Sequence, residues 1–387
     1  MKTKPQIMIL HNIISPYRLP LFEELSKKYD LTVYFCKTNN KDRKWSTKLD
    51  NYSFNYKILL NKDFGPFVIN STLKDELKEN NFDVYIVFEN PENAFSILKI
   101  IKFCKNNSKR MILVTERKDD DVYTLKRFNQ SSNPIKKRIY EAIRFAYKKY
   151  RSELYNRVEV IIPFYNKSAK FLIKNKINLN KLFTSREIMP EQLLPKLRSI
   201  KKPKEWKDKK IIFHIGYLND RKGINYLIEA FNKLDRKDTI LLIAGVGESE
   251  EKLKELAKKN KNIIFLGYKD GIDKANYYAI ADFFVLPTLY DVWGLVVNEA
   301  FYYGLPVIST NKAGATELIE EGKTGFVIKD KNVTQLANTM KKLLDNPRLL
   351  KKMKQNVKKI PNSKIVDIKT SVKTFEKAIN YALMGGK

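Results

Sequence analysis

The chain has 387 residues, 43% hydrophobic and 12% aromatic, and its 74 Lys and Arg against 43 Asp and Glu give a formal charge of +31. This length and apolar content exclude a disordered protein and predict two domains. Two cysteines exclude a disulfide framework or a four-cysteine zinc site and indicate a cytoplasmic location, and the absence of an apolar run of about 18 residues predicts no transmembrane helix.

Apolar runs alternate with amphipathic stretches along the chain, a pattern typical of parallel α/β architecture. Strands of the first half are predicted over residues 7–12, 31–36, 84–89, 111–116 and 158–164. Helices of the first half are predicted to include residues 17–28, 92–105 and 134–156. Strands of the second half are predicted over residues 211–218, 239–247, 262–268, 281–287 and 305–310. Helices of the second half are predicted to include residues 224–234, 249–260 and 296–303.

A basic, proline-containing segment separates the two halves and predicts a domain boundary. We expect a Rossmann-like domain over 1–190, a linker over 191–209 and a second Rossmann-like domain over 210–365. A C-terminal helix over 366–387 is expected to return to the first domain. Two such domains facing each other would leave a cleft lined by the carboxyl ends of both sheets, where open α/β sheets bind ligands.

The segment 289–328 places two acidic side chains around a predicted strand-to-helix turn. Asp291 precedes the turn, Gly294 lies in it and Glu299 lies in the helix. Backbone amides at a helix N-terminus can face a phosphate, and a carboxylate can accept hydrogen bonds from vicinal sugar hydroxyls. The alternative is that these acids form only a solvated helix face.

This segment resembles the acid-x7-acid motif of glycosyltransferase family 4, whose members are retaining enzymes with the GT-B fold. Asp291 and Glu299 stand at the acidic positions, and Leu295 and Gly304 belong to the match. Members usually carry Glu where this chain has Asp291, which is one methylene shorter. The resemblance implies that Glu299 holds the nucleotide ribose and that Asp291 acts on the donor sugar. It also implies that no metal or cofactor is needed beside the nucleotide-diphosphate sugar.

A second match lies in residues 215–231, where Gly216 follows a predicted strand and Lys222 begins a helix. A cation and free amides at such a turn suit a diphosphate. In the family an Arg and a Lys bind this group; Lys222 matches the Lys, whereas Tyr217 stands at the Arg position. Arg221 either compensates or is an exposed first-turn charge. The resemblance adds donor-binding positions in neighbouring loops: Gly245, Gly267 and Tyr268.

The first domain offers two candidate residues. Its first loop ends in Arg18 and resembles a subset of the family with Pro-Tyr-Arg there; Arg18 is expected to bind acceptor or phosphate, unless the prolines only shape the helix entry. Many members have a cleft His in this domain, but here Glu116 ends a strand. Glu116 is a candidate for stabilising the donor ring or holding the acceptor hydroxyl, or it pairs with a neighbouring cation. His11 and His214 are predicted to be core residues.

Two charged segments remain. Asp119, Asp120 and Asp121 are similar to the metal-binding Asp-x-Asp of the GT-A fold, but we interpret them as a solvated turn and predict no metal site. Residues 134–156 have apolar positions at helical spacing and Lys and Arg on the other face. Such a helix either lies on anionic lipid headgroups or packs its apolar stripe on the core.

The sequence therefore predicts a hexosyltransferase that moves a sugar, with retention, from a nucleotide-diphosphate sugar to a hydroxyl acceptor. The expected acceptor is a lipid-linked or surface-polysaccharide glycan at the cytoplasmic face of the membrane. Two alternatives stay open: a nucleic-acid-binding protein driven by charge, although no recognition motif supports it, and a GT-B-type sugar-nucleotide epimerase. A lysine-rich compositional bias accounts for part of the charge.

Overall fold

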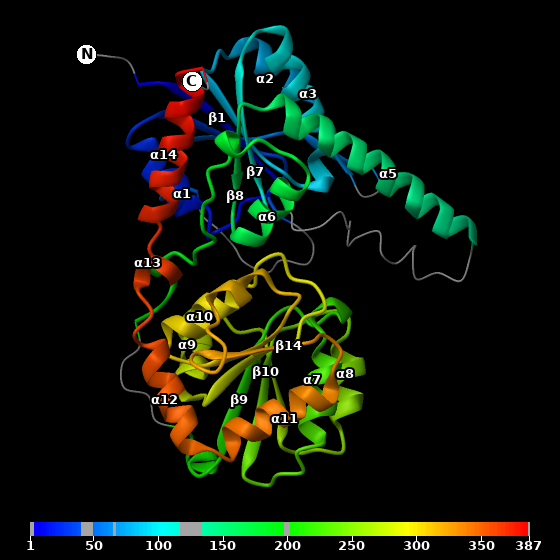
Figure 1. Ribbon diagram of the computed structural model, residues 1–387, viewed down its shortest axis with the longest axis vertical. Helices are drawn as coiled ribbons and strands as arrows, with labels where there is room; N and C mark the ends of the chain where they lie inside the picture. Colours follow the sequence, from blue (N-terminus) through cyan, green and yellow to red (C-terminus); the bar gives the residue numbers. More distant parts are fainter. Residues whose placement is uncertain (1–3, 40–48, 65–66, 117–133, 197–201, 386–387) are drawn as a thin grey trace. The chain divides into compact units, whose positions relative to one another are not determined.

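The computed structural model describes residues 4–39, 49–64, 67–116, 134–196 and 202–385 (Figure 1). Contacts divide the chain into two units, Met1–Glu187 with Ile368–Lys387 and Ile188–Asp367. The described residues of the segment predicted as a linker cluster with the second unit.

The first unit contains a six-stranded parallel sheet with the order β3-β2-β1-β6-β7-β8. Its strands are β1 (Gln6–His11), β2 (Asp30–Phe35), β3 (Asn55–Ile58), β6 (Val84–Phe88), β7 (Arg110–Thr115) and β8 (Val160–Pro163). Between β3 and β6 in the chain, β4 (Asn61–Phe64) and β5 (Phe67–Asn70) form a separate antiparallel pair. Counted along the sheet's own strands, the order is 3-2-1-4-5-6, the doubly wound Rossmann order.

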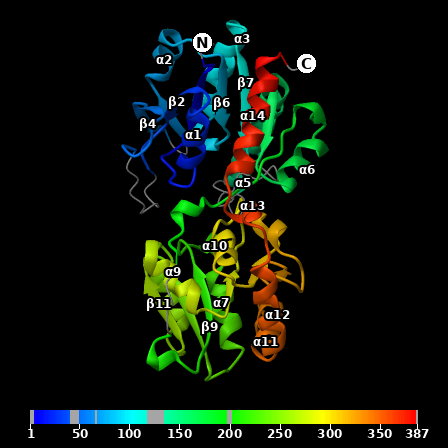
Figure 2. The same ribbon diagram turned by 90° about the vertical axis from the view of Figure 1, so that its left-hand side faces the viewer.

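Helices cover this first sheet. They are α1 (Leu19–Ser26), α2 (Leu73–Glu79), α3 (Ala94–Asn106), α5 (Pro134–Arg157), α6 (Asn166–Lys174) and α14 (Lys369–Leu383). Helix α14 packs on α1, β7 and β8 (Figures 1 and 2) and stacks the Phe375 ring on Phe88 with centroids 6.3 Å apart. The C-terminal helix therefore completes the core of the first unit, as the sequence predicted.

The second unit repeats the same topology, with a parallel sheet of order β11-β10-β9-β12-β13-β14. Its strands are β9 (Lys210–Ile215), β10 (Thr239–Ala244), β11 (Ile263–Gly267), β12 (Phe283–Leu286), β13 (Val307–Thr310) and β14 (Gly325–Ile328). Its helices are α7 (Ile224–Asn232), α8 (Glu250–Ala257), α9 (Gly271–Ile280), α10 (Val296–Tyr302), α11 (Val333–Leu344), α12 (Pro347–Val357) and α13 (Asn362–Ile365). Side chains of β9, β10 and β12 are buried on both faces, which explains their continuous apolar runs.

Every predicted strand overlaps an observed one, whereas several short strands escaped prediction. All four residues of β3 are exposed, so this edge strand has no apolar run that would mark it. Strand β14 is only four residues long and lies at the end of the segment 289–328, too short for a clear apolar run. Exposure therefore explains why β3 was not predicted, and shortness explains why β14 was not.

Candidate functional site

In a sheet of order 3-2-1-4-5-6, the loops after the first and fourth strands run in opposite directions and leave a crevice at the carboxyl edge. In the second unit these are the loops after β9 and β12. The short helix η6 (Asp220–Lys222) follows β9, and its Arg221 carbonyl accepts hydrogen bonds from Leu289 N at 2.8 Å and Thr288 Oγ1 at 3.0 Å. These bonds fix the two loops to each other.

Two cations and one carboxylate meet between these two loops. Asp291 accepts a hydrogen bond from Lys222 Nζ, and Arg221 Nη1 lies 3.7 Å from Asp291 Oδ1 and donates to the Tyr290 carbonyl at 2.9 Å. The side chains of Lys222 and Asp291 are 12% and 13% exposed. We call Arg221, Lys222 and Asp291 the Asp291 cluster; it carries one net positive charge. A methyl group at Gly294 would lie 3.8 Å from Asp291 Oδ2, so this glycine borders the cluster.

Glycines let the loops of the site approach one another. Gly245 has φ +132°, and a methyl group there would lie 1.8 Å from the Gly216 carbonyl oxygen. Gly223 has φ +66°, and a methyl group there would lie 2.3 Å from the Pro287 carbonyl oxygen. Gly245 was predicted to let the nucleotide approach. In the structure, the side chain it lacks would collide with the protein's own backbone.

The remaining predicted donor positions lie on the same edge of the sheet. Tyr217 donates to Glu248 Oε2 at 3.4 Å and so links the loops after β9 and β10. Tyr268 follows Gly267 at the end of β11, is 45% exposed and donates to Asp270. Leu295 is the half-buried residue before α10.

Glu299 lies on α10 and is buried, with two partners that sequence reasoning missed. Its Oε1 accepts from Lys274 Nζ at 2.9 Å and its Oε2 accepts from Tyr278 OH at 2.8 Å. Burial lowers the pKa of Lys274, but the Glu299 carboxylate outweighs this effect and the pKa is raised. Each Glu299 oxygen still has a lone pair for a further donor. No motif marked Lys274 or Tyr278, since both lie on a helix well before Glu299.

A second cluster of one aspartate and two cations, which we call the Asp282 cluster, lies at the opposite edge of this sheet. Asp282 precedes β12, its side chain is 13% exposed, and it pairs with Lys202 at 3.5 Å and Lys354 at 3.6 Å. Asp282 Oδ2 also accepts from Ile211 N at 2.8 Å. Because it occupies the amino edge, the Asp282 cluster is an internal control for the Asp291 cluster.

The first unit brings both of its predicted residues together at the carboxyl edge of its sheet. Arg18 is buried, donates to Glu116 Oε1 and donates to Glu187 Oε2 at 2.8 Å. Its guanidinium carbon lies 4.1 Å from the centre of the Phe164 ring. Burial raises the pKa of Glu187 to about 7; Arg18 lowers it and Glu116 adds to the rise. Glu187 was not predicted, because it lies outside any strand or motif.

Helix α5 only partly follows its predicted stripe. Its C-terminal half packs on the core through Leu154 and Tyr155, and Tyr155 OH donates to Glu89 at 3.0 Å. Its N-terminal half extends outward from the first unit in Figure 1 and leaves Ile135, Ile139 and Phe145 exposed by 66%, 47% and 72%.

The acidic run Asp119 to Asp121 lies outside the described residues. Within the described ranges, no three His, Cys, Asp or Glu side chains come close enough to hold a metal ion. No helix of the described part of the chain is long and apolar enough to cross a membrane.

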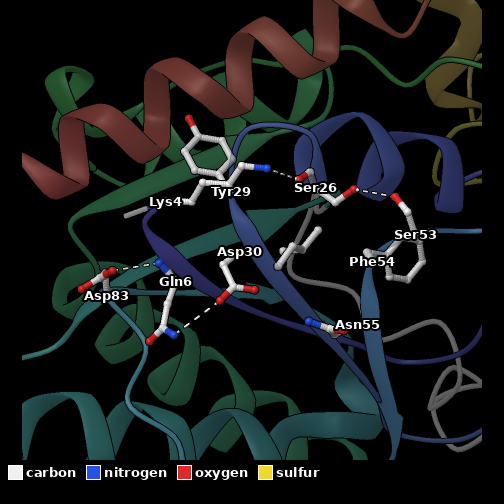
Figure 3. Close-up of a pocket in the computed structure, with 10 residues that line it drawn as sticks. Lys4, Gln6, Ser26, Tyr29, Asp30, Ser53, Phe54, Asn55 and Asp83 are labelled. Atoms are coloured by element: carbon white, nitrogen blue, oxygen red, sulfur yellow. Dashed lines mark hydrogen bonds between the residues drawn. The ribbon is translucent and has the colours of Figure 1, made fainter. Parts of the chain in front are cut away.

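A cavity of about 690 Å³ lies in the first unit at the amino ends of its strands (Figure 3). Its polar groups bind one another: Gln6 N donates to Asp83 at 2.8 Å, Gln6 Nε2 donates to Asp30 at 3.4 Å, and Lys4 donates to the Ser26 carbonyl. This cavity is on the edge opposite Arg18 and Glu116 and contains neither.

The chain is similar in sequence and in fold to known glycosyltransferases. The family described as Glycosyl transferases group 1 matches residues 196–360. An uncharacterized glycosyltransferase of Haemophilus influenzae is 27% identical over 84% of each chain, and the alpha-D-kanosaminyltransferase of Streptomyces kanamyceticus is 28% identical over 41% of this chain and 42% of that protein. The crystal structure of Anabaena HepE in complex with UDP has a TM-score of 0.73 at 14% identity and covers 98% of this chain and 100% of that one.

The structural likeness shows that the fold is GT-B, with two Rossmann-like units. The match to the group 1 family and the relatives together support a glycosyltransferase of that superfamily.

Proposed function

We propose that this protein transfers a sugar, with retention and without a metal, from a nucleotide-diphosphate sugar to a hydroxyl acceptor. The observation that carries the proposal is the Asp291 cluster at the switch point between β9 and β12. Related structures include Anabaena HepE with UDP and with UDP-glucose, which supports a uridine nucleotide as the first donor to test.

The cluster supplies what a departing diphosphate needs. One carboxylate holds two cations in the free protein, so an entering anion finds charge that is only half neutralised. Lys222 would move its ammonium group to a phosphate oxygen, and Arg221 would stay bound to the Tyr290 carbonyl and lend its charge. Stabilising the leaving diphosphate lowers the barrier to breaking the bond between the sugar and the phosphate.

Two carboxylates would position the rest of the donor. Once Lys222 binds phosphate, Asp291 is released to accept hydrogen bonds from sugar hydroxyls. Glu299 would accept from the ribose hydroxyls while Lys274 and Tyr278 keep its carboxylate in place. Retention follows from the resemblance to family 4, and the anomeric proton of the product reports it by NMR.

The first unit would bind the acceptor. Arg18 orients the carboxylate of Glu116, and Tyr165 OH holds the Glu116 carbonyl at 2.6 Å. A carboxylate fixed in this way can accept a hydrogen bond from an acceptor hydroxyl. A relative from Staphylococcus aureus, 29% identical over 39% of this chain, is named as a capsular polysaccharide biosynthesis glycosyltransferase. This name supports a surface-polysaccharide glycan, free or lipid-linked, as the acceptor to test.

Helix α5 would hold the protein on the inner face of an anionic membrane. Its exposed Ile139 and Phe145 stand among basic side chains, the combination that binds anionic headgroups. Pelleting with vesicles that contain phosphatidylglycerol should be lost in Ile139→Ser with Phe145→Ser. Leu179→Ser, at a site 61% exposed outside α5, should still pellet. Equal pelleting of all three proteins would exclude this role for α5.

The direct test is a panel of nucleotide sugars screened for thermal stabilisation of the full chain. A ligand at 100 times its Kd stabilises by about 2.7 kcal/mol, which a melting curve resolves. Stabilisation by one sugar nucleotide, followed by release of its nucleoside diphosphate when a glycan acceptor is added, is the expected result. Binding by none contradicts the proposal. A rearranged sugar nucleotide formed without acceptor would instead indicate an epimerase.

Asp291→Asn separates sugar contact from phosphate contact. Removing the charge frees both cations, so binding of the bare nucleoside diphosphate should hold or tighten, whereas sugar transfer should fall at least tenfold, about 1.4 kcal/mol of lost transition-state stabilisation. Asp282→Asn, the matched change in the Asp282 cluster, should alter neither. Unchanged transfer in Asp291→Asn would contradict the role given to this carboxylate.

A further inference from the structure

His214 on β9 presents a buried hydrogen-bond acceptor that the fold does not use. Its Nδ1 lies 2.9 Å from the Val285 carbonyl oxygen, which only accepts, so Nδ1 carries the hydrogen and Nε2 holds a lone pair. His214 is fully buried, and its Nε2 has no hydrogen-bond partner among the described residues. A buried polar atom without a partner needs an explanation.

The position of Nε2 supplies one. A methyl group at Gly216 would lie 3.5 Å from His214 Nε2 and 3.8 Å from Lys222 Cε. The imidazole, the open face of Gly216 and the side chain of Lys222 therefore border one small space at the turn after β9. This is the turn to which the proposed function assigns the donor diphosphate.

Lys222 is the charged group that acts on the imidazole. Burial lowers the pKa of His214, the hydrogen bond to the Val285 carbonyl opposes this, and the charge of Lys222 adds to the lowering. The resulting pKa is about 4, so the ring is neutral at pH 7 in the free protein. Its other neighbours are apolar: Ile243 pairs with it on β10, and the Phe284 ring of β12 stacks on it at 11°. On α9, which packs on β9, Lys274 is bound to Glu299.

We propose that His214 belongs to the phosphate site and that its Nε2 takes up a proton from solvent when the diphosphate binds. The inference rests on the proposed function. An entering anion draws Lys222 from Asp291 onto a phosphate oxygen, which uncovers Nε2 and places negative charge beside it. Both changes favour the imidazolium form, whose N–H donates to a second phosphate oxygen. The site gains one positive charge as the ligand enters.

Titration calorimetry tests this with the best-binding member of UDP, GDP, ADP, CDP and dTDP. Heats measured in two buffers of different ionisation enthalpy count the protons bound on complex formation. His214→Asn keeps an amide donor for the Val285 carbonyl but cannot titrate. His11→Asn is the matched control, because His11 is also buried with Nδ1 2.8 Å from a carbonyl oxygen, that of Ile13, in the first unit.

The wild type and His11→Asn should take up as much as one proton more than His214→Asn. Their affinity should also rise as the pH falls from 8 to 6, by up to about tenfold per pH unit relative to His214→Asn. Equal proton counts and parallel pH profiles in all three proteins would overturn the proposal. Absence of binding by every nucleotide would instead contradict the proposed function.

A measurement on the wild type avoids any effect of substitution on folding. The chain contains two histidines, so imidazole-labelled protein gives two ring signals that the variants assign. With saturating nucleoside diphosphate at pH 6, the His214 signal should move to the protonated position while that of His11 stays neutral. A His214 ring that remains neutral in the saturated complex would refute the inference.

Discussion

Glu187→Gln tests whether the first unit holds a carboxyl group that is protonated below neutral pH. Glu187 is buried and shares the single charge of Arg18 with Glu116. Burial raises the pKa of Glu187 from 4.5 to about 7, against the opposing effect of Arg18. Glutamine has the shape of the neutral acid, so the variant resembles the wild type below this range and departs from it above.

The sign and size of the effect follow from the pKa shift. Because the folded state holds a proton that the unfolded state releases above pH 4.5, the stabilisation from Glu187 is present below pH 4.5 and is lost as the pH rises through about 7. Between pH 5 and pH 8 the free energy of unfolding of the wild type should fall by roughly 2–3 kcal/mol relative to that of Glu187→Gln. This corresponds to about 5–10 °C in Tm for a unit of this size. His11, whose pKa burial lowers to about 3, has the opposite trend up to about pH 6.5, but it is common to both proteins and cancels.

The assay compares the wild type with Glu187→Gln at pH 5 and pH 8 by scanning calorimetry. Hydrogen exchange in peptides from β1 and α1 assigns the transition of the first unit. The variant should gain stability relative to the wild type as the pH rises. A difference that is constant with pH, or that grows in favour of the wild type, would refute the reasoning.

Other consequences of the geometry can be measured directly. Gly245→Ala puts a methyl group 1.8 Å from the Gly216 carbonyl oxygen, so the melting temperature of the second unit should fall, with a loss of about 3 kcal/mol or more; an unchanged melting curve would show that the loops are not packed as described. Lys274→Met removes one partner of the buried Glu299 carboxylate and should cost about 3 kcal/mol of stability and weaken nucleotide binding. If Glu299→Gln in the same chain restores the stability, the pairing of Lys274 with Glu299 is supported. If it also restores nucleotide binding, a ribose contact that needs the charged Glu299 carboxylate is contradicted.

Local sequence patterns predicted most of the strands, because a buried strand shows as a run of neighbouring apolar residues. Lys222 and Asp291 were each predicted as donor-site residues from the family resemblance, but their ion pair joins positions 69 residues apart and was not predicted. Lys222 and Asp291 each follow a core strand at a turn, and parallel strands bring such turns to one edge. Glu187 could not be predicted in this way, since it meets Arg18 across 169 residues of sequence. Neither could Lys274, which reaches Glu299 from a different helix.

Two sequence signals were incomplete without the structure. The apolar stripe of α5 was treated as one face, but the structure buries Leu154 and exposes Ile135, because only the C-terminal part of the helix packs on the core of the first unit. The spacing of apolar residues identifies which face of a helix is apolar, but it does not show how much of the helix length packs against the rest of the protein. His214 had the pattern of a core residue and is one, but its unused Nε2 became visible only when Gly216 and Lys222 were placed beside it.

The most direct test of the central claim compares two lysines that each pair with an aspartate, on opposite edges of one sheet. Lys222 and Lys354 each pair with an aspartate that is 13% exposed and that a second cation also binds. The Kd of the nucleoside diphosphate should rise about 10- to 100-fold in Lys222→Ala, the loss of one charge-assisted phosphate contact of about 1.5–3 kcal/mol. The same Kd should be unchanged in Lys354→Ala. Equal affinities in the two variants would contradict the assignment of the donor site to the crevice between β9 and β12.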